Sequence, residues 1–183
     1  MTRLIVVTGI PASGKSTVAA ALARRSARGV VVDGDTIRAM VVSGYVDMTR
    51  EPSEEALRQL RLRYQASLAV AGVYLQAGFD VVFNDNILGP MLGELPGLVP
   101  CARFHLVVLS PGPETIRHRD RERAKTAYTA ENGSFDWLCN VLAKETPRLG
   151  LWLDTSHQTP DETADVIIAK LDESLIVTDA TRG

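Results

Sequence analysis

The residues that point most directly to chemistry lie near the N-terminus, in residues 9–17. They are, in order, Gly9, Ile10, Pro11, Ala12, Ser13, Gly14, Lys15, Ser16 and Thr17. This is the spacing of a phosphate-binding loop, in which two glycines frame the loop and a lysine and a hydroxyl residue follow. The glycines let successive N–H groups turn toward one phosphate, while Lys15 can reach the terminal phosphates and Ser16 can bind Mg²⁺. We therefore predict that the whole segment binds a nucleoside triphosphate.

A second group of candidates follows the next apolar run, where Asp33-Gly34-Asp35 is followed by Arg38. We predict that Asp35 is a general base that takes a proton from an attacking hydroxyl. Arg38 lies one helical turn beyond Asp35, where it can bind the acceptor or shield the transferred phosphoryl group. Asp33 can shape the turn, contact the substrate or hold Mg²⁺ through water. The alternative is that Asp35 caps a helix and Arg38 is a surface charge.

A third group, Asn84-Asp85-Asn86, ends another apolar run. Asp85 can hold a Mg²⁺-bound water, position the attacking hydroxyl or bind the acceptor. We place Asn86 in the acceptor site as well. The alternative is a polar turn that only closes a strand.

A cluster of basic residues runs from Arg117 to Lys125. Arginines on a lid that closes over the nucleotide can stabilise transition-state charge and exclude water. We predict this role for Arg117 and Arg121, and the same segment offers Arg123 and Lys125. The lid would span about residues 117–134 of the sequence. The alternative is a helix surface covered with salt bridges. Arginines also cluster at positions 58, 61 and 63, and we interpret them mainly as a solvated face from which one could reach the acceptor.

These candidates need strands and helices to position them. Apolar, β-branched runs predict strands at residues 4–7, 30–32, 79–83, 104–109 and 151–153. Helical patterns occupy residues 18–25, 53–77, 135–145 and the stretches after 113 and 159. Alternation of this kind predicts an α/β fold with a parallel sheet, in which ligands bind beyond the carboxyl ends of the strands. We expect residues 176–183 to form a frayed tail.

Length and composition limit the remaining possibilities. A chain of 183 residues suits one α/β domain, which we expect to span residues 1–183. The formal net charge of −2 provides no basic field for long duplex DNA, which leaves a short 5′-hydroxyl oligonucleotide as the one nucleic-acid candidate. The two cysteines make no disulfide framework, so we expect a reducing compartment and a cytoplasmic protein. No stretch reaches the length of a membrane span. No feature specifies an oligomeric state.

Over nearly its whole length, from about residue 3 to 172, the chain resembles the small P-loop kinases of the nucleoside-monophosphate-kinase-like group. Within that group the loop at 9–17, Asp33-Gly34-Asp35, residues 84–89 and Asp154-Thr155-Ser156 are similar to chloramphenicol phosphotransferase and its relatives. The resemblance implies three layers with a five-stranded parallel sheet in the order 2-3-1-4-5. It also implies that Asp35 is the base, that Thr155 and Gln158 lie near the nucleotide base, and that a hydroxyl of a small antibiotic accepts the phosphate.

Other readings remain open beside this one. Asp33-Gly34-Asp35 with Arg38 is also similar to adenylylsulfate kinase, and Asp35 with Arg38 resembles 5′-hydroxyl polynucleotide kinase. A nucleotide-dependent binding module that does not phosphorylate its ligand is the non-enzymatic alternative. No motif chooses between ATP and GTP. The expected activity is a Mg²⁺-dependent phosphotransferase with an alcohol group as acceptor, which could confer antibiotic resistance.

Overall fold

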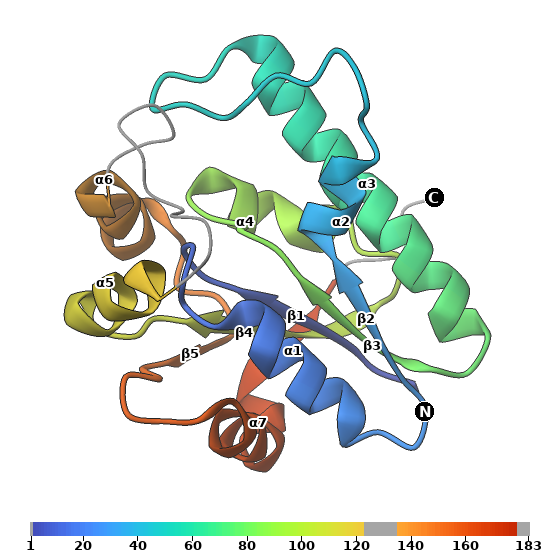
Figure 1. Ribbon diagram of the computed structural model, residues 1–183. Coiled ribbons are helices and arrows are strands. Elements are labelled where there is room, and N and C mark those ends of the chain that lie inside the picture. The colour runs from blue at the N-terminus through green and yellow to red at the C-terminus, as the bar shows by residue number, and fades with distance from the viewer. Residues whose placement is uncertain (1, 123–134, 179–183) are drawn as a thin grey trace.

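The apolar runs form a parallel sheet at the centre of the molecule (Figure 1). The computed structural model describes residues 2–122 and 135–178. The parallel strands are β1 (Leu4–Thr8), β2 (Gly29–Asp33), β3 (Asp80–Asn84), β4 (Arg103–Leu109) and β5 (Leu151–Leu153). Their order, β2-β3-β1-β4-β5, is the predicted order.

The helices alternate with these strands along the chain. They are α1 (Lys15–Arg24), α2 (Gly34–Ala39), α3 (Glu54–Gln76), α4 (Pro90–Glu94), α5 (Pro113–Arg121), α6 (Phe135–Asn140) and α7 (Pro160–Ala169). Short 3₁₀ turns cover Leu95–Gly97 and Leu171–Ser174, and a π-helical turn covers Val141–Glu145. Side chains cap two of these helices: Ser53 accepts a hydrogen bond from the N–H of Ala56, and Thr159 forms a capping box with Glu162.

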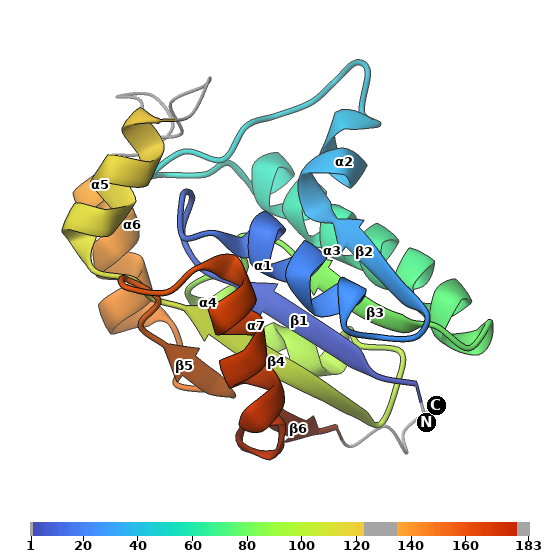
Figure 2. The ribbon, with the colours of Figure 1, turned by 60° about the horizontal axis from the view of Figure 1, so that its bottom comes forward.

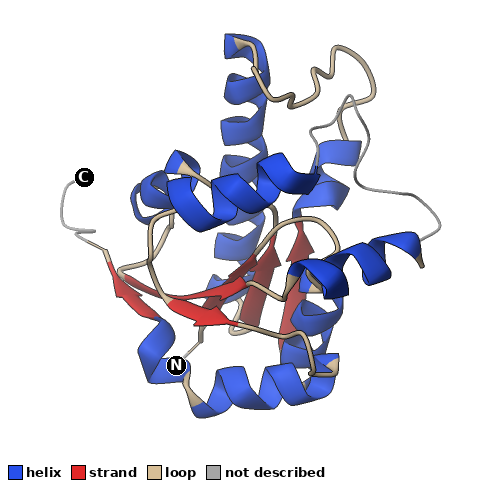
Figure 3. Cartoon of the chain, turned by 90° about the vertical axis from the view of Figure 1, so that its left-hand side faces the viewer, coloured by secondary structure: helices blue, strands red, loops and turns tan. Residues whose placement is uncertain are grey.

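Helices cover both faces of the sheet, as Figure 3 shows from the side. Successive residues of a strand point to opposite faces, so Val6 and Val7 of β1 enter different clusters. Val6 packs with residues of α3, α4 and α5. Val7 packs with residues of α1 and α7. Both layers of the core are therefore built from the same central strands.

The chain after α7 departs from the sequence prediction. Residues 175–177, of which we expected 176 and 177 to belong to a frayed tail, form a sixth strand, β6 (Leu175–Val177). β6 pairs antiparallel with the start of β4, in the register Arg103↔Val177 (Figure 2). The cause is that β5 pairs only with Val107–Leu109, which leaves the first part of β4 as an open edge.

The parallel register brings the carboxyl ends of the strands to one edge. Asp33, the last residue of β2, lies opposite Asn84, the last residue of β3. The loop after β3 is fixed to β1, because the buried Thr8 hydroxyl donates to the Ile87 carbonyl at 2.9 Å and accepts from the Ile87 N–H at 2.9 Å. Among the described residues, no helix is long and apolar enough to cross a membrane.

Candidate active site

The phosphate-binding loop connects β1 to α1 and contains the backbone that its glycines predict. Gly9 has φ 151° and Gly14 has φ 98°, and a Cβ on Gly9 would lie 2.5 Å from the Leu109 carbonyl oxygen. Lys15 Nζ donates to the Ile10 carbonyl at 2.9 Å, which folds the side chain back over the loop. Together with the N-terminus of α1, this arrangement concentrates positive potential where phosphates would bind.

Three polar side chains meet beside the start of α1. Asp33 Oδ2 lies 3.5 Å from Ser16 Oγ and accepts from Asn84 Nδ2 at 2.8 Å. Asp33 Oδ1 caps α2 by accepting from the N–H groups of Asp35 and Thr36. Asp33 rather than Asp35 is therefore the helix cap, contrary to the alternative raised above. Asn84 is 3% exposed, and its Oδ1 has no hydrogen-bond partner among the described residues.

This cluster is chemically suited to Mg²⁺. The ion prefers oxygen ligands from carboxylates, hydroxyls and amides, and it keeps several waters. Ser16, Asp33 and the unpartnered Asn84 Oδ1 provide such oxygens next to the phosphate-binding loop. Asp85 was the other metal candidate, but its carboxylate is bound by Arg63 instead. Within the described residues, no group of three or more His, Cys, Asp and Glu side chains forms a metal site of another kind.

Asp35 lies on the first turn of α2, with 68% of its side chain exposed. Arg38 Nε is 3.8 Å from its Oδ1, as their spacing of one helical turn predicts. Arg38 also donates to the Tyr45 hydroxyl at 3.3 Å, which raises the pKa of Arg38, and Tyr45 in turn donates to Asp47 at 2.9 Å. An exposed carboxylate beside a guanidinium can accept a proton while the arginine holds an oxygen of the acceptor.

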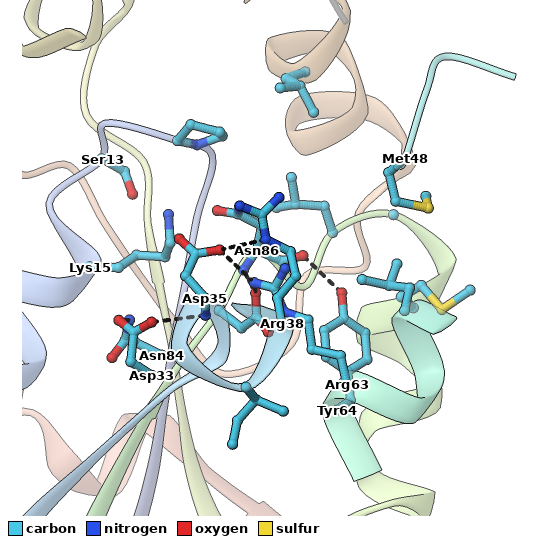
Figure 4. A pocket seen from close by; sticks show the side chains of 18 of the residues that line it. Ser13, Lys15, Asp33, Asp35, Arg38, Met48, Arg63, Tyr64, Asn84 and Asn86 are labelled. Atoms are coloured by element: carbon cyan, nitrogen blue, oxygen red, sulfur yellow. Dashed lines mark hydrogen bonds and ion pairs between the residues drawn. The ribbon is translucent and has the colours of Figure 1, made fainter. Parts of the chain in front are cut away.

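Asp85 is the fully buried member of the site, with none of its side chain exposed. Arg63 of α3 donates to both carboxylate oxygens, from Nε at 2.7 Å and from Nη2 through a short contact. Arg63 Nη2 also reaches Asp35 Oδ1 at 3.2 Å (Figure 4). Burial raises the pKa of Asp85, and the charge of Arg63 opposes that shift. Arg63 therefore connects the buried carboxylate to the exposed one.

The opposite end of the site is formed by α5 and the loop after β5. Arg119 donates to the Ser13 carbonyl at 3.1 Å and to the Thr155 carbonyl at 2.9 Å, and burial lowers the pKa of Arg119. Thr155 is 2% exposed, and its Oγ1 has no partner among the described residues. Gln158 accepts from the Thr163 hydroxyl at 3.2 Å. This end can therefore contact a nucleotide base with polar groups and the Arg119 guanidinium.

The predicted lid arginines are not brought into the site. Arg117 pairs with Glu114 at 2.9 Å and with Asp136 at 3.5 Å, and it stacks on Phe135, so it joins α5 to α6. Arg121, the last residue of α5, is exposed and does not line the cavity described below. The candidates at 123 and 125 and the predicted lid tip lie outside the described residues.

One cavity of about 1330 Å³ joins these groups. It extends from Thr155 and Arg119, past Lys15 and Ser16, to the space between α2, α3 and α6. Figure 1 shows α5 and α6 on one side of this edge of the sheet and α2 and α3 on the other. Predicted residues that line the cavity are Pro11 to Thr17, Asp33, Asp35, Arg38, Asp85, Asn86, Thr155 and Gln158.

Arg63 and Arg119, which make the contacts described above, have no specific role in the sequence prediction. Arg63 was grouped with a solvated face, although only 13% of its side chain is exposed. The sequence feature that indicates its burial is its position next to Tyr64, which belongs to the buried stripe of α3. The sequence prediction assigns the lid role to Arg117 and Arg121 instead of Arg119, although Arg119 follows the buried Ile116 by three residues, a spacing that directs both side chains to one face.

Comparison with known proteins supports this reading of the fold. The sequence profile of the AAA domain family matches residues 4–142, more than half of the chain. A search among curated proteins finds no match to this sequence.

Solved structures give the same fold over nearly the whole chain. A sugar kinase from Janibacter sp. HTCC2649 has a TM-score of 0.68 at 19% identity, covering 95% of this chain and 96% of that one. The tunicamycin resistance protein of Deinococcus radiodurans has a TM-score of 0.66 at 16% identity, covering 96% and 98%. The APS kinase of Mycobacterium tuberculosis, in complex with AMPPNP and APS, has a TM-score of 0.62 at 19% identity, covering 93% and 98%.

Proposed function

From the premise that this chain belongs to the AAA domain family, among its small P-loop kinase-like members, we propose that it is a Mg²⁺-dependent kinase. It transfers the γ-phosphoryl group of ATP or GTP to a hydroxyl of a small molecule. The observation that carries the proposal is that Asp35, flanked by Arg38 and Arg63, lines the same cavity as Lys15 and Ser16. A pure nucleotide switch has no need of such a base in a cavity that extends beyond the phosphate-binding loop.

Each residue has a defined part in this reaction. The loop amides and Lys15 bind the β- and γ-phosphates, and Asp35 accepts the proton of the acceptor hydroxyl. The hydroxyl oxygen forms a bond to the γ-phosphorus while the bond from that phosphorus to the bridging oxygen breaks, and the nucleoside diphosphate leaves with the electron pair. Ser16, Asp33 and Asn84 would hold Mg²⁺, which neutralises phosphate charge. Positioning and electrostatics supply most of the rate.

Mass spectrometry of an acceptor panel tests the proposal. The protein is incubated with Mg²⁺ and either ATP or GTP, and the panel contains antibiotics, sugars, nucleosides, adenylylsulfate and a 5′-hydroxyl oligonucleotide. We expect a gain of one phosphate on a hydroxyl compound, its loss with EDTA and its loss in Lys15→Ala. An antibiotic deserves a place in the panel because a tunicamycin resistance protein has the same fold. Nucleotide binding without transfer to any compound would favour the binding module instead.

A further inference from the structure

The acceptor side of the cavity, which we define as the part lined by residues 35–66, 85–94 and 137–145, has a largely apolar wall. The loop before α3, the first half of α3, the loop after β3 and α6 all contribute apolar side chains to it. Prominent among them are Met48, Leu57, Leu60, Leu88, Met91 and Trp137. Figure 4 shows Met48 and Tyr64 on the side of the cavity opposite Lys15 and Asp33. Contact between such a wall and the hydrocarbon surface of a ligand removes both from water, which favours binding, whereas the wall offers few hydrogen bonds to a polyol.

The charges on this side argue against an anionic acceptor. Five acidic side chains and four arginines line it, so it carries no net positive charge. Arg61 is matched by Glu94 at 3.0 Å, and Arg63 is matched by the buried Asp85. Arg38 lies between Asp35 and the Tyr45 hydroxyl, so Arg50 is the one arginine of this lining without a partner among the described residues. A phosphorylated or sulfated acceptor would find a single free guanidinium there, in the field of these carboxylates.

One polar group on the acceptor side is left without a partner. Asn86 lines the cavity, and its Oδ1 is buried with no hydrogen-bond partner among the described residues. The main-chain carbonyl oxygen of Asn86, by contrast, accepts a hydrogen bond from the Tyr64 hydroxyl at 2.9 Å. A buried acceptor without a partner costs free energy until a donor reaches it. A ligand N–H or O–H group is a donor of this kind.

Within the proposed kinase function, on which this inference rests, we infer that the acceptor is an uncharged amphipathic alcohol. Its apolar body, aromatic or aliphatic, packs against Met48, Leu57 and Met91. A donor group of the same molecule binds Asn86 Oδ1, and the reactive hydroxyl is presented to Asp35. Sugars, polyols and phosphorylated metabolites fit this side less well, because they leave the apolar wall uncovered or introduce negative charge among the carboxylates of the lining.

Three small alcohols separate these classes: 1-phenylpropane-1,3-diol, glycerol and glycerol 3-phosphate. Each carries a primary hydroxyl, and they differ in apolar surface and charge. Binding is measured by saturation-transfer NMR with Mg²⁺ and the analogue AMPPNP present, and phosphorylation is measured separately by mass spectrometry with Mg²⁺ and ATP. We expect the aryl diol to bind at least about tenfold more tightly than either other compound. Equal or tighter binding of glycerol or glycerol 3-phosphate would overturn the inference, as would a failure of all three to bind.

Matched variants locate the binding. Met48→Glu places a charge on the apolar wall in an irregular loop, and we expect it to weaken binding of the aryl diol by about tenfold or more while AMPPNP binding is unchanged. Val73→Glu makes the same kind of change on an exposed position of α3 outside the cavity and should have no effect. An equal loss in both variants, or no loss in Met48→Glu, contradicts the inference.

The two proposals can fail separately in this experiment. Selective binding of the aryl diol, lost in Met48→Glu but without transfer of phosphate to any compound, would support the amphipathic ligand and contradict the kinase. Preferential phosphorylation of glycerol or glycerol 3-phosphate would support the kinase and overturn the amphipathic acceptor.

Discussion

At the scale of single residues, Arg63 determines how the two carboxylates of the acceptor side are arranged. It fully pairs the buried Asp85 and still reaches Asp35 with one nitrogen. A buried ion pair is not in itself strongly stabilising, but removing one partner leaves an uncompensated charge in a low-dielectric environment. Arg63 is therefore a positioning residue whose loss should be visible in stability as well as in activity.

We expect Arg63→Ala to lower the free energy of unfolding by about 3 kcal/mol, because Asp85 then remains buried without a charged partner. Urea denaturation measures this change. The double variant Arg63→Ala with Asp85→Ala should recover a large part of the loss. Arg61→Ala, two residues earlier on the same helix, breaks the half-exposed pair with Glu94 and should cost no more than about 1 kcal/mol. Similar losses in both arginine variants would contradict the distinction.

The second prediction at this scale concerns Asp35, the proposed proton acceptor. Asp35→Asn keeps the size of the side chain but removes the base, so we expect kcat to fall by about 10²–10⁴ with little change in nucleotide affinity. Turnover and the Kd of a fluorescent nucleotide analogue measure the two effects. Asp47→Asn is a matched control, since Asp47 also lines the cavity but accepts a hydrogen bond from Tyr45. Full activity in Asp35→Asn would remove it as the base.

The sequence reveals residues of this site where local spacing defines the chemistry, as it does for Lys15, Ser16 and Asp33. Arg63 and Arg119 depend instead on how α3 and α5 are rotated about their axes, which packing against the sheet decides. Asn84 meets Asp33 because β2 and β3 are neighbours in a fixed register. A single sequence indicates where the strands lie, but it does not indicate which strands become neighbours in the sheet.

At the scale of elements, α2 packs so closely against the loop after β3 that only glycine fits at its first position. A Cβ on Gly34 would lie 1.9 Å from Asp85 Oδ2. Asp85 is held by Arg63 and by the N–H of Asn86, so it has no room to retreat without disturbing the acceptor side. The sequence Asp33-Gly34-Asp35 is thus constrained by packing as well as by chemistry.

We expect Gly34→Ala to destabilise the fold and to reduce kcat, since the methyl group displaces Asp85 and with it Arg63. Gly72→Ala on α3 is the control, because its Cβ would make an ordinary contact of 3.7 Å with Pro100. Gly72→Ala should stabilise the protein by about 0.5–1 kcal/mol, as alanine favours a helix interior. Thermal unfolding and turnover, measured on both variants, test the contrast. Unchanged activity in Gly34→Ala would show that Asp85 can move freely.

The same scale shows where element prediction succeeds and where it fails. The start of α3 and the start of α7 have a local signal, because Ser53 and Thr159 are capping residues and cap these helices in the structure. β6 has no such local signal, since its pairing depends on the edge of β4 that β5 leaves open. The π-helical turn at Val141–Glu145 likewise interrupts a stretch whose pattern predicts one continuous helix.

At the scale of the whole molecule, the active site and the ion pair between Arg3 and Asp80 lie at opposite ends of the strands. Asp80 begins β3 at the end of the sheet opposite the active site. It accepts hydrogen bonds from Arg3, through the backbone N–H at 2.8 Å and through Nη2 at 2.6 Å, and from Ser26 at 2.8 Å. These contacts join the start of β1, the start of β3 and the turn after α1, so the pair can be altered without touching the cavity.

This separation allows a test of stability that leaves catalysis intact. Burial of Asp80 is outweighed by its bonds to Arg3 and Ser26, which hold its pKa below the ordinary value of 3.8. A lowered pKa stabilises the fold above that value, and the contribution is lost as the pH falls through the folded-state pKa. We expect Asp80→Asn to cost about 1 kcal/mol near pH 7, or about 2–4 °C in Tm, and progressively less as the pH falls below 3.8. Asp172→Asn, whose side chain has no hydrogen bond or ion pair within the described chain, should change Tm little over this pH range. A Tm difference for Asp80→Asn that persisted at low pH, or a loss of turnover, would show that Asp80 acts through packing or through the active site.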